Sequence, residues 1–165
     1  MKTTIKIKLL TDVIGKKLLL ETMEAFNDAC NEISATCFSE HSASKFFIQK
    51  LVYHQIREKY NLSAQLTIRA IAKTCEAYKL NKKVQPKFKK RGCITYDPRI
   101  LTFNSNYSKV SMNTLRGRNK FNILIRDYFK GNINRAKGQV RVDLGIKNIA
   151  VTSNGDVSII THSLY

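Results

Sequence analysis

The fold is decided by the first part of the chain, where an alternating pattern of apolar side chains gives way to a helical one. The alternating stretch is Thr3-Thr4-Ile5-Lys6-Ile7-Lys8-Leu9-Leu10, and its period of two is typical of a β-strand. Thr11-Asp12 then offers an N-cap, and apolar residues recur at helical spacing as far as Cys37. The sequence therefore predicts a strand over residues 3–10 and a long helix over about 12–38.

Two more helices and a series of short strands are predicted after the first helix. Apolar spacing indicates helices over about 44–59 and 63–79, separated by the turn-forming Asn61-Leu62-Ser63. We interpret the chain as an α+β protein, in which a small β-barrel carries a three-helix insertion at about 11–80 and includes the first strand. The short β-like pieces of this barrel are residues 94–96, 100–103, 107–112 and 121–125.

The last part of the chain has the most regular pattern. Between residues 140 and 145, apolar residues alternate with Arg141, Asp143 and Gly145. Asn154-Gly155 is a strong two-residue hairpin signal between β-forming residues. The expected organisation is thus a β-barrel with its helical insertion over 1–126, a polar linker over 127–139 and a terminal hairpin segment over 140–165.

The charge balance points to a polyanionic partner. The chain has 29 Lys and Arg against 12 Asp and Glu, which gives a net charge of +17 and a pI near 9.9. Such a field attracts DNA or RNA, because each cation that neutralises a phosphate also releases a counterion. The alternatives are a basic protein without such a partner, ribosomal-type binding and an anionic membrane surface.

The cations cluster between the third helix and the first short strand. Seven positive charges lie from Lys79 to Arg91, and no acid occurs between Glu76 and Asp97. Flexible cations pair with phosphates and an aromatic ring can stack on a base, although a solvated linker would show the same composition. Ser63 and Gln65 could read base edges or simply start the third helix. The candidate nucleic-acid-binding residues are Lys82, Lys83, Lys87, Phe88, Lys89, Lys90, Arg91 and Gln65.

Other side chains give weaker signals. The four cysteines form no Cys-x-x-Cys pair, so we expect no zinc and interpret Cys30 and Cys37 as core residues on one helix face. No run of 18 apolar residues occurs, and the start lacks the apolar core of a signal peptide. We therefore expect a cytoplasmic protein with no membrane partner. Surface or packing roles are expected for His41, His54 and His162.

Asp143 is the candidate catalytic residue. On a strand, its side chain would project from the face opposite Val142 and Leu144. A carboxylate in this position suits a metal-dependent nuclease, although two-metal hydrolysis needs several carboxylates. The alternative is an Asp that faces solvent on an edge hairpin.

The residues around Asp143 resemble a known motif. The string from Val142 to Val151, with Asn154-Gly155-Asp156 after it, is similar to the first RuvC-type motif of the OrfB/TnpB family. These are insertion-sequence-encoded proteins, once called transposases, that are understood as RNA-guided DNA nucleases related to type V CRISPR effectors. Further pieces resemble the family in the same order, so the likeness covers nearly the whole chain. They are residues 62–66, 76–79, 86–89, 94–97 and 114–118.

The resemblance carries implications for partners, cofactor and site. It implies a ribonuclease-H-like fold around Asp143, Mg²⁺ held by Asp143 as metal ligand and catalytic residue, double-stranded DNA as a partner, and a guide-type RNA. The chain departs from the family in its later part, because only Asp156 follows Asp143 and the zinc ribbon is absent. Residues 136–140, which resemble a region that normally lies several dozen residues earlier, run almost directly into the motif.

These departures predict an incomplete nuclease segment. Only 22 residues follow Asp143, so we expect C-terminal truncation, an internal deletion and loss of cleavage. The function expected is a transposon-associated protein that binds DNA and RNA without cutting. The alternatives are a binding-only regulator, an enzyme completed by a second chain, and a nonfunctional gene remnant. The oligomeric state stays open.

Overall fold

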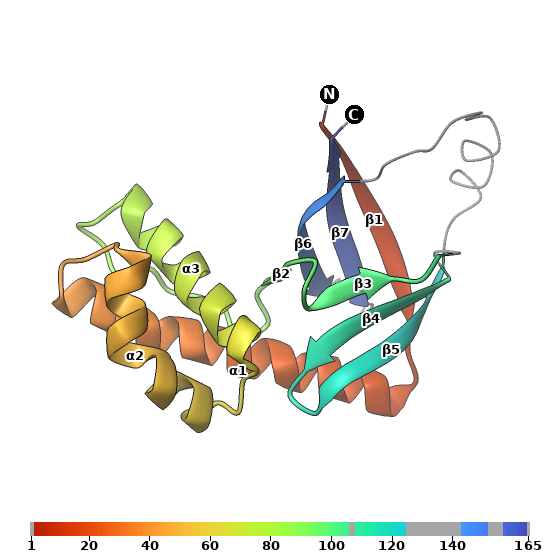
Figure 1. Ribbon diagram of the computed structural model, residues 1–165, viewed down its shortest axis with the longest axis horizontal. Coiled ribbons are helices and arrows are strands. Elements are labelled where there is room, and N and C mark those ends of the chain that lie inside the picture. The colour runs from red at the N-terminus through yellow and green to blue at the C-terminus, as the bar shows by residue number, and fades with distance from the viewer. Residues whose placement is uncertain (1, 106–107, 125–142, 152–156, 165) are drawn as a thin grey trace.

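The chain begins with a strand that leads directly into its longest helix. A computed structural model describes residues 2–105, 108–124, 143–151 and 157–164 (Figure 1). Strand β1 (Lys2–Leu10) precedes helix α1 (Val13–Ser39), in agreement with the alternating and helical patterns. Asp12 caps α1, because its Oδ1 accepts a hydrogen bond of 2.7 Å from the Gly15 amide.

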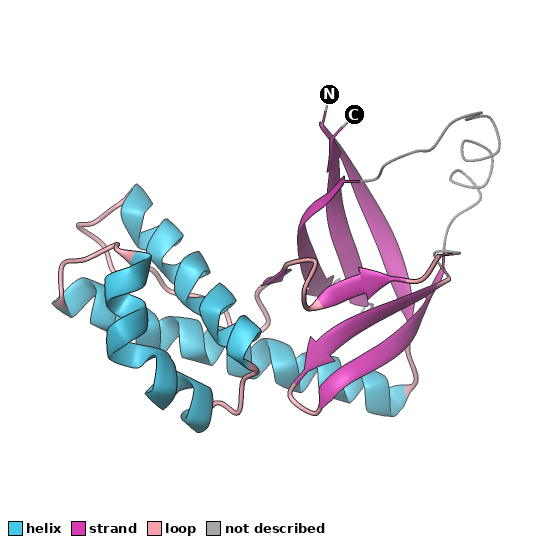
Figure 2. Ribbon diagram, viewed as in Figure 1, coloured by secondary structure: helices cyan, strands magenta, loops and turns pink. Residues whose placement is uncertain are grey.

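Two shorter helices, α2 (Lys45–Lys59) and α3 (Ala64–Leu80), follow α1 and pack on it. The chain turns between helices at His41 and Asn61, whose φ angles of 47° and 49° are in the left-handed region. The three predicted helices are therefore confirmed, as an insertion between β1 and the remaining strands (Figure 2). None of the described helices is long and apolar enough to cross a membrane.

The described strands form one antiparallel sheet in the order β2-β6-β7-β1-β5-β4-β3. Its α+β class is as predicted, and β1 joins the later strands as expected. The pairings leave β2 and β3 at the two ends of this order, so they show an open sheet and no barrel closure within the described strands. The strands not yet given are β2 (Ile94–Tyr96), β3 (Leu101–Phe103), β4 (Lys109–Thr114), β5 (Gly117–Leu124), β6 (Asp143–Val151) and β7 (Val157–Leu164).

The boundaries of β4 and β5 differ from the prediction. Strands were expected over 107–112 and 121–125, whereas β4 and β5 meet in a tight turn whose last pair is Thr114 and Gly117. Gly117 has a φ of 84°, which a residue with a side chain adopts only with strain. The first half of β5 is polar, so it gave no hydrophobic signal of a strand.

The predicted terminal hairpin is confirmed as an antiparallel pair. Strands β6 and β7 pair from Asp143 with Leu164 to Val151 with Val157. β7 also pairs with β1 and β6 with β2, so the hairpin strands lie in the same sheet as the N-terminal strand. The turn at Asn154-Gly155 and the linker predicted over 127–139 lie outside the described residues.

Among the described residues, one apolar cluster joins the helices to the inner face of the sheet. α1 contributes a stripe that includes Phe26, which is fully buried. The stripe recurs every three or four residues, as an amphipathic helix requires, and it holds α3 and β4 in place. The cluster includes Leu19, Met23, Phe26, Cys30, Ile33, Cys37, Leu66, Ala70, Ile71, Cys75, Tyr78, Val110, Met112, Phe121 and Ile123.

Candidate nucleic-acid interface

The basic segment between α3 and β2, residues 81–93, is fixed to α1 although it forms no helix or strand. We call this segment the basic strap. Asn27, Asn31 and Ser34 lie four and three residues apart on α1, so their side chains form one row along the helix. Asn27 Nδ2 donates hydrogen bonds to the Met23 carbonyl of its own helix and, at 2.8 Å, to the Gly92 carbonyl of the strap. The row therefore replaces the backbone partners that an irregular segment lacks.

Asn31 makes the most specific of these links. Its Oδ1 accepts a hydrogen bond of 2.8 Å from the Phe88 amide, and its Nδ2 donates one of 2.9 Å to the Phe88 carbonyl. One turn further along α1, Ser34 Oγ donates to the Pro86 carbonyl over 2.6 Å. Both backbone groups of Phe88 are thus satisfied by one side chain, which fixes the strap in position along α1.

Lys73 of α3 also binds the strap, at Cys93 and Phe88. Its ammonium donates to Asn27 Oδ1 at 3.1 Å and to the Cys93 carbonyl at 2.6 Å. It also lies 5.4 Å from the centre of the Phe26 ring and 5.1 Å from that of Phe88. Burial lowers the pKa of Lys73, while the nearby Cys30 and Cys93 thiols act in the opposite direction.

Phe88 serves as the anchor of the strap. The structure places it half-buried, packed against the core, with the Lys73 ammonium over its ring. The sequence predicted that this ring stacks on a base. In the structure the ring packs against the core and holds the strap in position. Because side chains of an extended segment alternate in direction, an inward Phe88 turns Lys87 and Lys89 outward. Both lysines are exposed.

The other predicted cations of the strap are also exposed, but not all of them are free of acids. Glu24 of α1 forms ion pairs with Arg91 at 3.1 Å and with Lys90 at 3.6 Å. No ion pair among the described residues involves Lys82, Lys83, Lys87 or Lys89. These four lysines are consequently the part of the strap that is available to an external anion.

Ser63 and Gln65 have structural partners at the start of α3. Ser63 caps the helix, because its Oγ accepts from the Leu66 amide, which confirms its helix-start role. Gln65 Nε2 donates to Asp97 Oδ2, and Asp97 Oδ1 accepts a hydrogen bond of 2.9 Å from the Arg99 amide. Gln65 therefore joins α3 to the turn after β2, and in this arrangement its amide is engaged within the protein.

A second cationic surface becomes visible only when β3, β4 and β5 are paired. Pleating turns alternate residues outward, and the pairs Ser111–Lys120 and Asn113–Arg118 lie on the face opposite the core. The sequence contains no Asp or Glu from residue 98 to residue 126. We call this surface the sheet face; it comprises Thr102, Lys109, Ser111, Asn113, Arg118, Lys120 and Asn122.

Arg118 organises the sheet face. Its Nε donates to Ser111 Oγ at 2.8 Å, its Nη1 to the Arg99 carbonyl at 3.0 Å and its Nη2 to Thr102 Oγ1 at 2.7 Å. The fork of the guanidinium thus spans β5, β4 and the residues around β3. Sequence reasoning missed this surface because its cations are dispersed along the chain; the only signal was the polar alternation of β4.

Asp143 begins β6, opposite Leu164 of β7. The direction of its side chain lies outside what the structure describes. Asp143 is the only carboxylate in β6 and β7, and the described residues contain no group of three or more His, Cys, Asp and Glu that could hold a metal. The Mg²⁺ site that the family resemblance implies therefore has no set of ligands among the described residues.

The cysteines and histidines behave largely as packing or surface residues. Cys30 and Cys37 are fully buried on one face of α1, which confirms their predicted place in the core. Burial raises the pKa of Cys30 to about 11, and Cys37 Sγ lies 3.9 Å from Cys75 Sγ of α3. His41 and His54 are exposed, whereas the side chain of His162 lies outside the described part of the chain.

Comparison with known proteins does not assign the chain to a family. No family model matches it, and no curated protein matches it either. The likeness to the OrfB/TnpB family accordingly depends on sequence motifs alone.

Proposed function

We propose that this protein binds nucleic acid through the basic strap. The observation that carries the proposal is the fixation of the strap by Asn27, Asn31 and Ser34, which holds exposed lysines on an ordered backbone. A solvated linker would have to be ordered on binding, at a cost in conformational entropy. A strap that is already ordered avoids most of that cost, so it is better suited to phosphate binding than its composition alone indicates.

The sheet face supplies additional contacts to the phosphate backbone. Arg118 is held by three hydrogen bonds, while Lys109 and Lys120 are exposed on the same face. Contacts of this kind position a nucleic acid without reading its sequence. The net charge of +17 adds a field that favours the approach of any polyanion.

The family resemblance extends this proposal to partners and origin. We infer a transposon-associated protein of the OrfB/TnpB type, with DNA and a guide-type RNA as partners and with a small β-barrel that carries the three-helix insertion. In such systems the guide pairs with its target while the protein holds the backbone. The division of the chain into a part over 1–126, a linker over 127–139 and a terminal segment over 140–165 is part of the same proposal.

We also propose that the 165-residue chain binds without cutting. The observation that favours a binding-only role is the lack of a second carboxylate in β6 and β7 beside Asp143. Two-metal hydrolysis needs several carboxylates, whereas the strap and the sheet face do not depend on Asp143. Incubation with duplex DNA, a guide-type RNA and Mg²⁺ should leave the DNA intact. Metal-dependent cutting that is abolished by Asp143→Ala would overturn the binding-only role.

Binding is tested with two variants that remove the same charge from different places. Lys87→Gln/Lys89→Gln changes the strap, and the control Lys16→Gln/Lys17→Gln changes the start of α1. Fluorescence anisotropy with duplex DNA and with RNA at low salt should show binding by the native chain. Loss of two phosphate contacts should weaken binding roughly tenfold or more in the strap variant, with a much smaller change in the control. No binding at low salt, or an equal loss in both variants, would contradict the proposal.

A further inference from the structure

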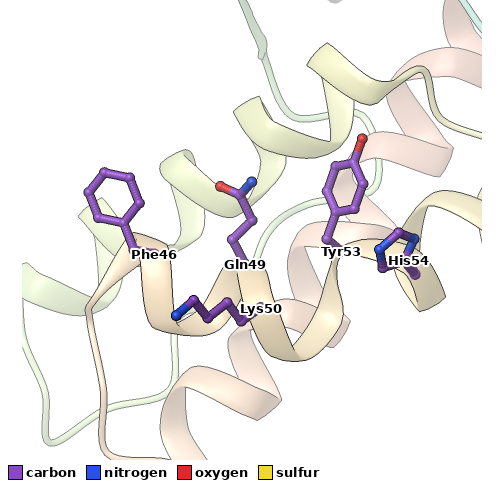
Figure 3. Close-up of a pocket in the computed structure, with 5 residues that line it drawn as sticks. All are labelled: Phe46, Gln49, Lys50, Tyr53 and His54. Atoms are coloured by element: carbon purple, nitrogen blue, oxygen red, sulfur yellow. The ribbon is translucent and has the colours of Figure 1, made fainter.

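A pocket lies on the outer surface of α2, and none of its lining residues belongs to the basic strap or the sheet face. It has a volume of about 410 Å³ and is lined by Phe46, Gln49, Lys50, Tyr53 and His54 (Figure 3). These residues follow one another at intervals of three, one, three and one, so they occupy one face of the helix. The buried residues of α2 lie on the opposite face, at Ile48, Val52 and Ile56.

The lining combines an open aromatic ring with groups that hydrogen-bond and carry charge. Phe46 is 79% exposed, although burial of a phenyl ring against apolar surface would be favourable. Figure 3 shows Phe46, Gln49 and Tyr53 extending to the same side of α2, with Lys50 and His54 beside them. The rings of Tyr53 and His54, which line the pocket, pack edge to face at 5.2 Å between centroids.

The charges around the pocket decide between possible occupants. No acid lines the pocket, and Glu58 is the only acid in α2. Lys50 takes part in no ion pair among the residues that the structure describes. An apolar segment of a partner protein would cover Phe46 but would leave the Lys50 ammonium without a counterion. A nucleotide matches both properties, because its base has an aromatic face and its phosphate is an anion.

We propose that this pocket binds one unpaired base of a single-stranded nucleic acid. Phe46 stacks on the base, Gln49 offers its amide to the edge of the base, and Lys50 pairs with the adjacent phosphate. Bases inside a duplex already stack on one another, so the pocket favours single strands. This inference rests on the proposed function and adds a preference that the basic strap alone does not supply.

The test compares two adjacent phenylalanines of α2. Phe46→Ala removes the ring of the pocket, whereas Phe47→Ala removes an exposed ring that does not line it. Affinity is measured by anisotropy for single-stranded DNA, single-stranded RNA and duplex DNA of one length. Phe46→Ala should weaken binding to the single strands about fivefold or more and leave the duplex unchanged, while Phe47→Ala should change neither. The DNA and RNA arms show which of the two strands the pocket accepts.

A second measurement separates this inference from the proposed function. Titration with adenosine monophosphate should shift the NMR signals of Phe46 and Tyr53, and ribose 5-phosphate should shift them much less. Equal effects of Phe46→Ala on single strands and duplex, or equal responses to the two small molecules, would overturn the pocket while leaving the basic strap intact. If the native chain binds no nucleic acid at low salt, the proposed function fails. A base-specific response to adenosine monophosphate would then still support the pocket as a nucleotide site.

Discussion

The basic strap and the sheet face present similar charges on very different backbones. The strap is an irregular segment whose backbone groups are satisfied by side chains of α1, chiefly Asn31. The sheet face is a regular ladder in which backbone pairs with backbone, and one guanidinium, that of Arg118, ties the strands together. The backbone under a cationic surface is thus held in two ways: by a row of polar side chains on a helix in the strap, and by strand pairing in the sheet face.

The comparison predicts that the strap depends mainly on a few side chains, whereas the sheet face depends mainly on backbone pairing. Asn31→Ala should have the largest effect, a loss of about 2 kcal/mol in the free energy of unfolding, because it leaves both backbone groups of Phe88 without partners. Urea denaturation measures the loss, and amide hydrogen exchange should show faster exchange at Phe88. The control Asn122→Ala, on the exposed sheet face, should change stability by less than about 0.5 kcal/mol. Equal stability of the two variants would break the comparison.

Arg118 tests the other surface. Arg118→Gln removes the fork that spans Ser111, Thr102 and the Arg99 carbonyl, and it should cost about 1 kcal/mol because these groups are exposed to water. Arg118→Lys should not restore the loss, since an ammonium cannot bond in the same fork. Hydrogen exchange in β4 should quicken while the Phe88 amide stays protected. A change at Phe88 would show that the two surfaces are not independent.

Glu32 gives a smaller, pH-dependent effect within the helices that support the strap. Burial acts to raise the pKa of Glu32, but hydrogen bonds from Lys59 and Tyr60 outweigh it and lower that pKa below its ordinary value of 4.5. A carboxyl whose pKa is lowered in the folded state stabilises the protein at pH values above its ordinary pKa. That stabilisation is lost as the pH falls through the lowered pKa.

The experiment on Glu32 compares stability at two pH values. Glu32→Gln should reduce the free energy of unfolding by less than about 1 kcal/mol at pH 7, and the difference from the native chain should shrink as the pH falls below 4.5. Thermal unfolding followed by circular dichroism measures both. A difference that stays constant from pH 7 to pH 3 would show that the ion pair with Lys59 is not its source.

The smallest effect on stability is expected for the exposed lysines of the basic strap, to which we assign phosphate binding. Lys87→Gln/Lys89→Gln should change the free energy of unfolding by less than about 0.5 kcal/mol, because neither lysine forms an ion pair among the described residues. The same variant should weaken nucleic-acid binding. A loss of stability comparable to that of Asn31→Ala would mean that these lysines serve the fold.

The difference between the two surfaces explains what the sequence could predict. The helices follow local patterns of apolar residues and caps such as Asp12 and Ser63, so the sequence predicted them closely. The cations of the strap are clustered in the sequence, so the sequence predicted them as well. The sequence did not predict the hydrogen bonds that hold the strap on α1. Asn31 and Phe88 are 57 residues apart, and polar residues on a helix give no signal of a distant backbone partner.

The sheet face shows the same limit in a different form. Arg118 and Thr102 become neighbours only through the pairing of β3 with β4 and of β4 with β5. No local pattern records that arrangement, and the polar start of β5 concealed the first half of that strand. The hairpin of β6 and β7 was predicted because the alternation and the Asn154-Gly155 turn signal are local. Its pairing with β1 and β2 again required the fold.

The most direct test of the central proposal is the salt dependence of binding. The affinity for duplex DNA is measured over a range of salt concentrations for the native chain and for a variant with Lys82, Lys83, Lys87 and Lys89 changed to Gln. If these lysines neutralise phosphates, the slope of log affinity against log salt should become less steep by about 3 to 4 in the variant, since each contact contributes about 0.9. The Lys16→Gln/Lys17→Gln control should keep nearly the native slope. An unchanged slope in the strap variant would contradict phosphate binding by the basic strap.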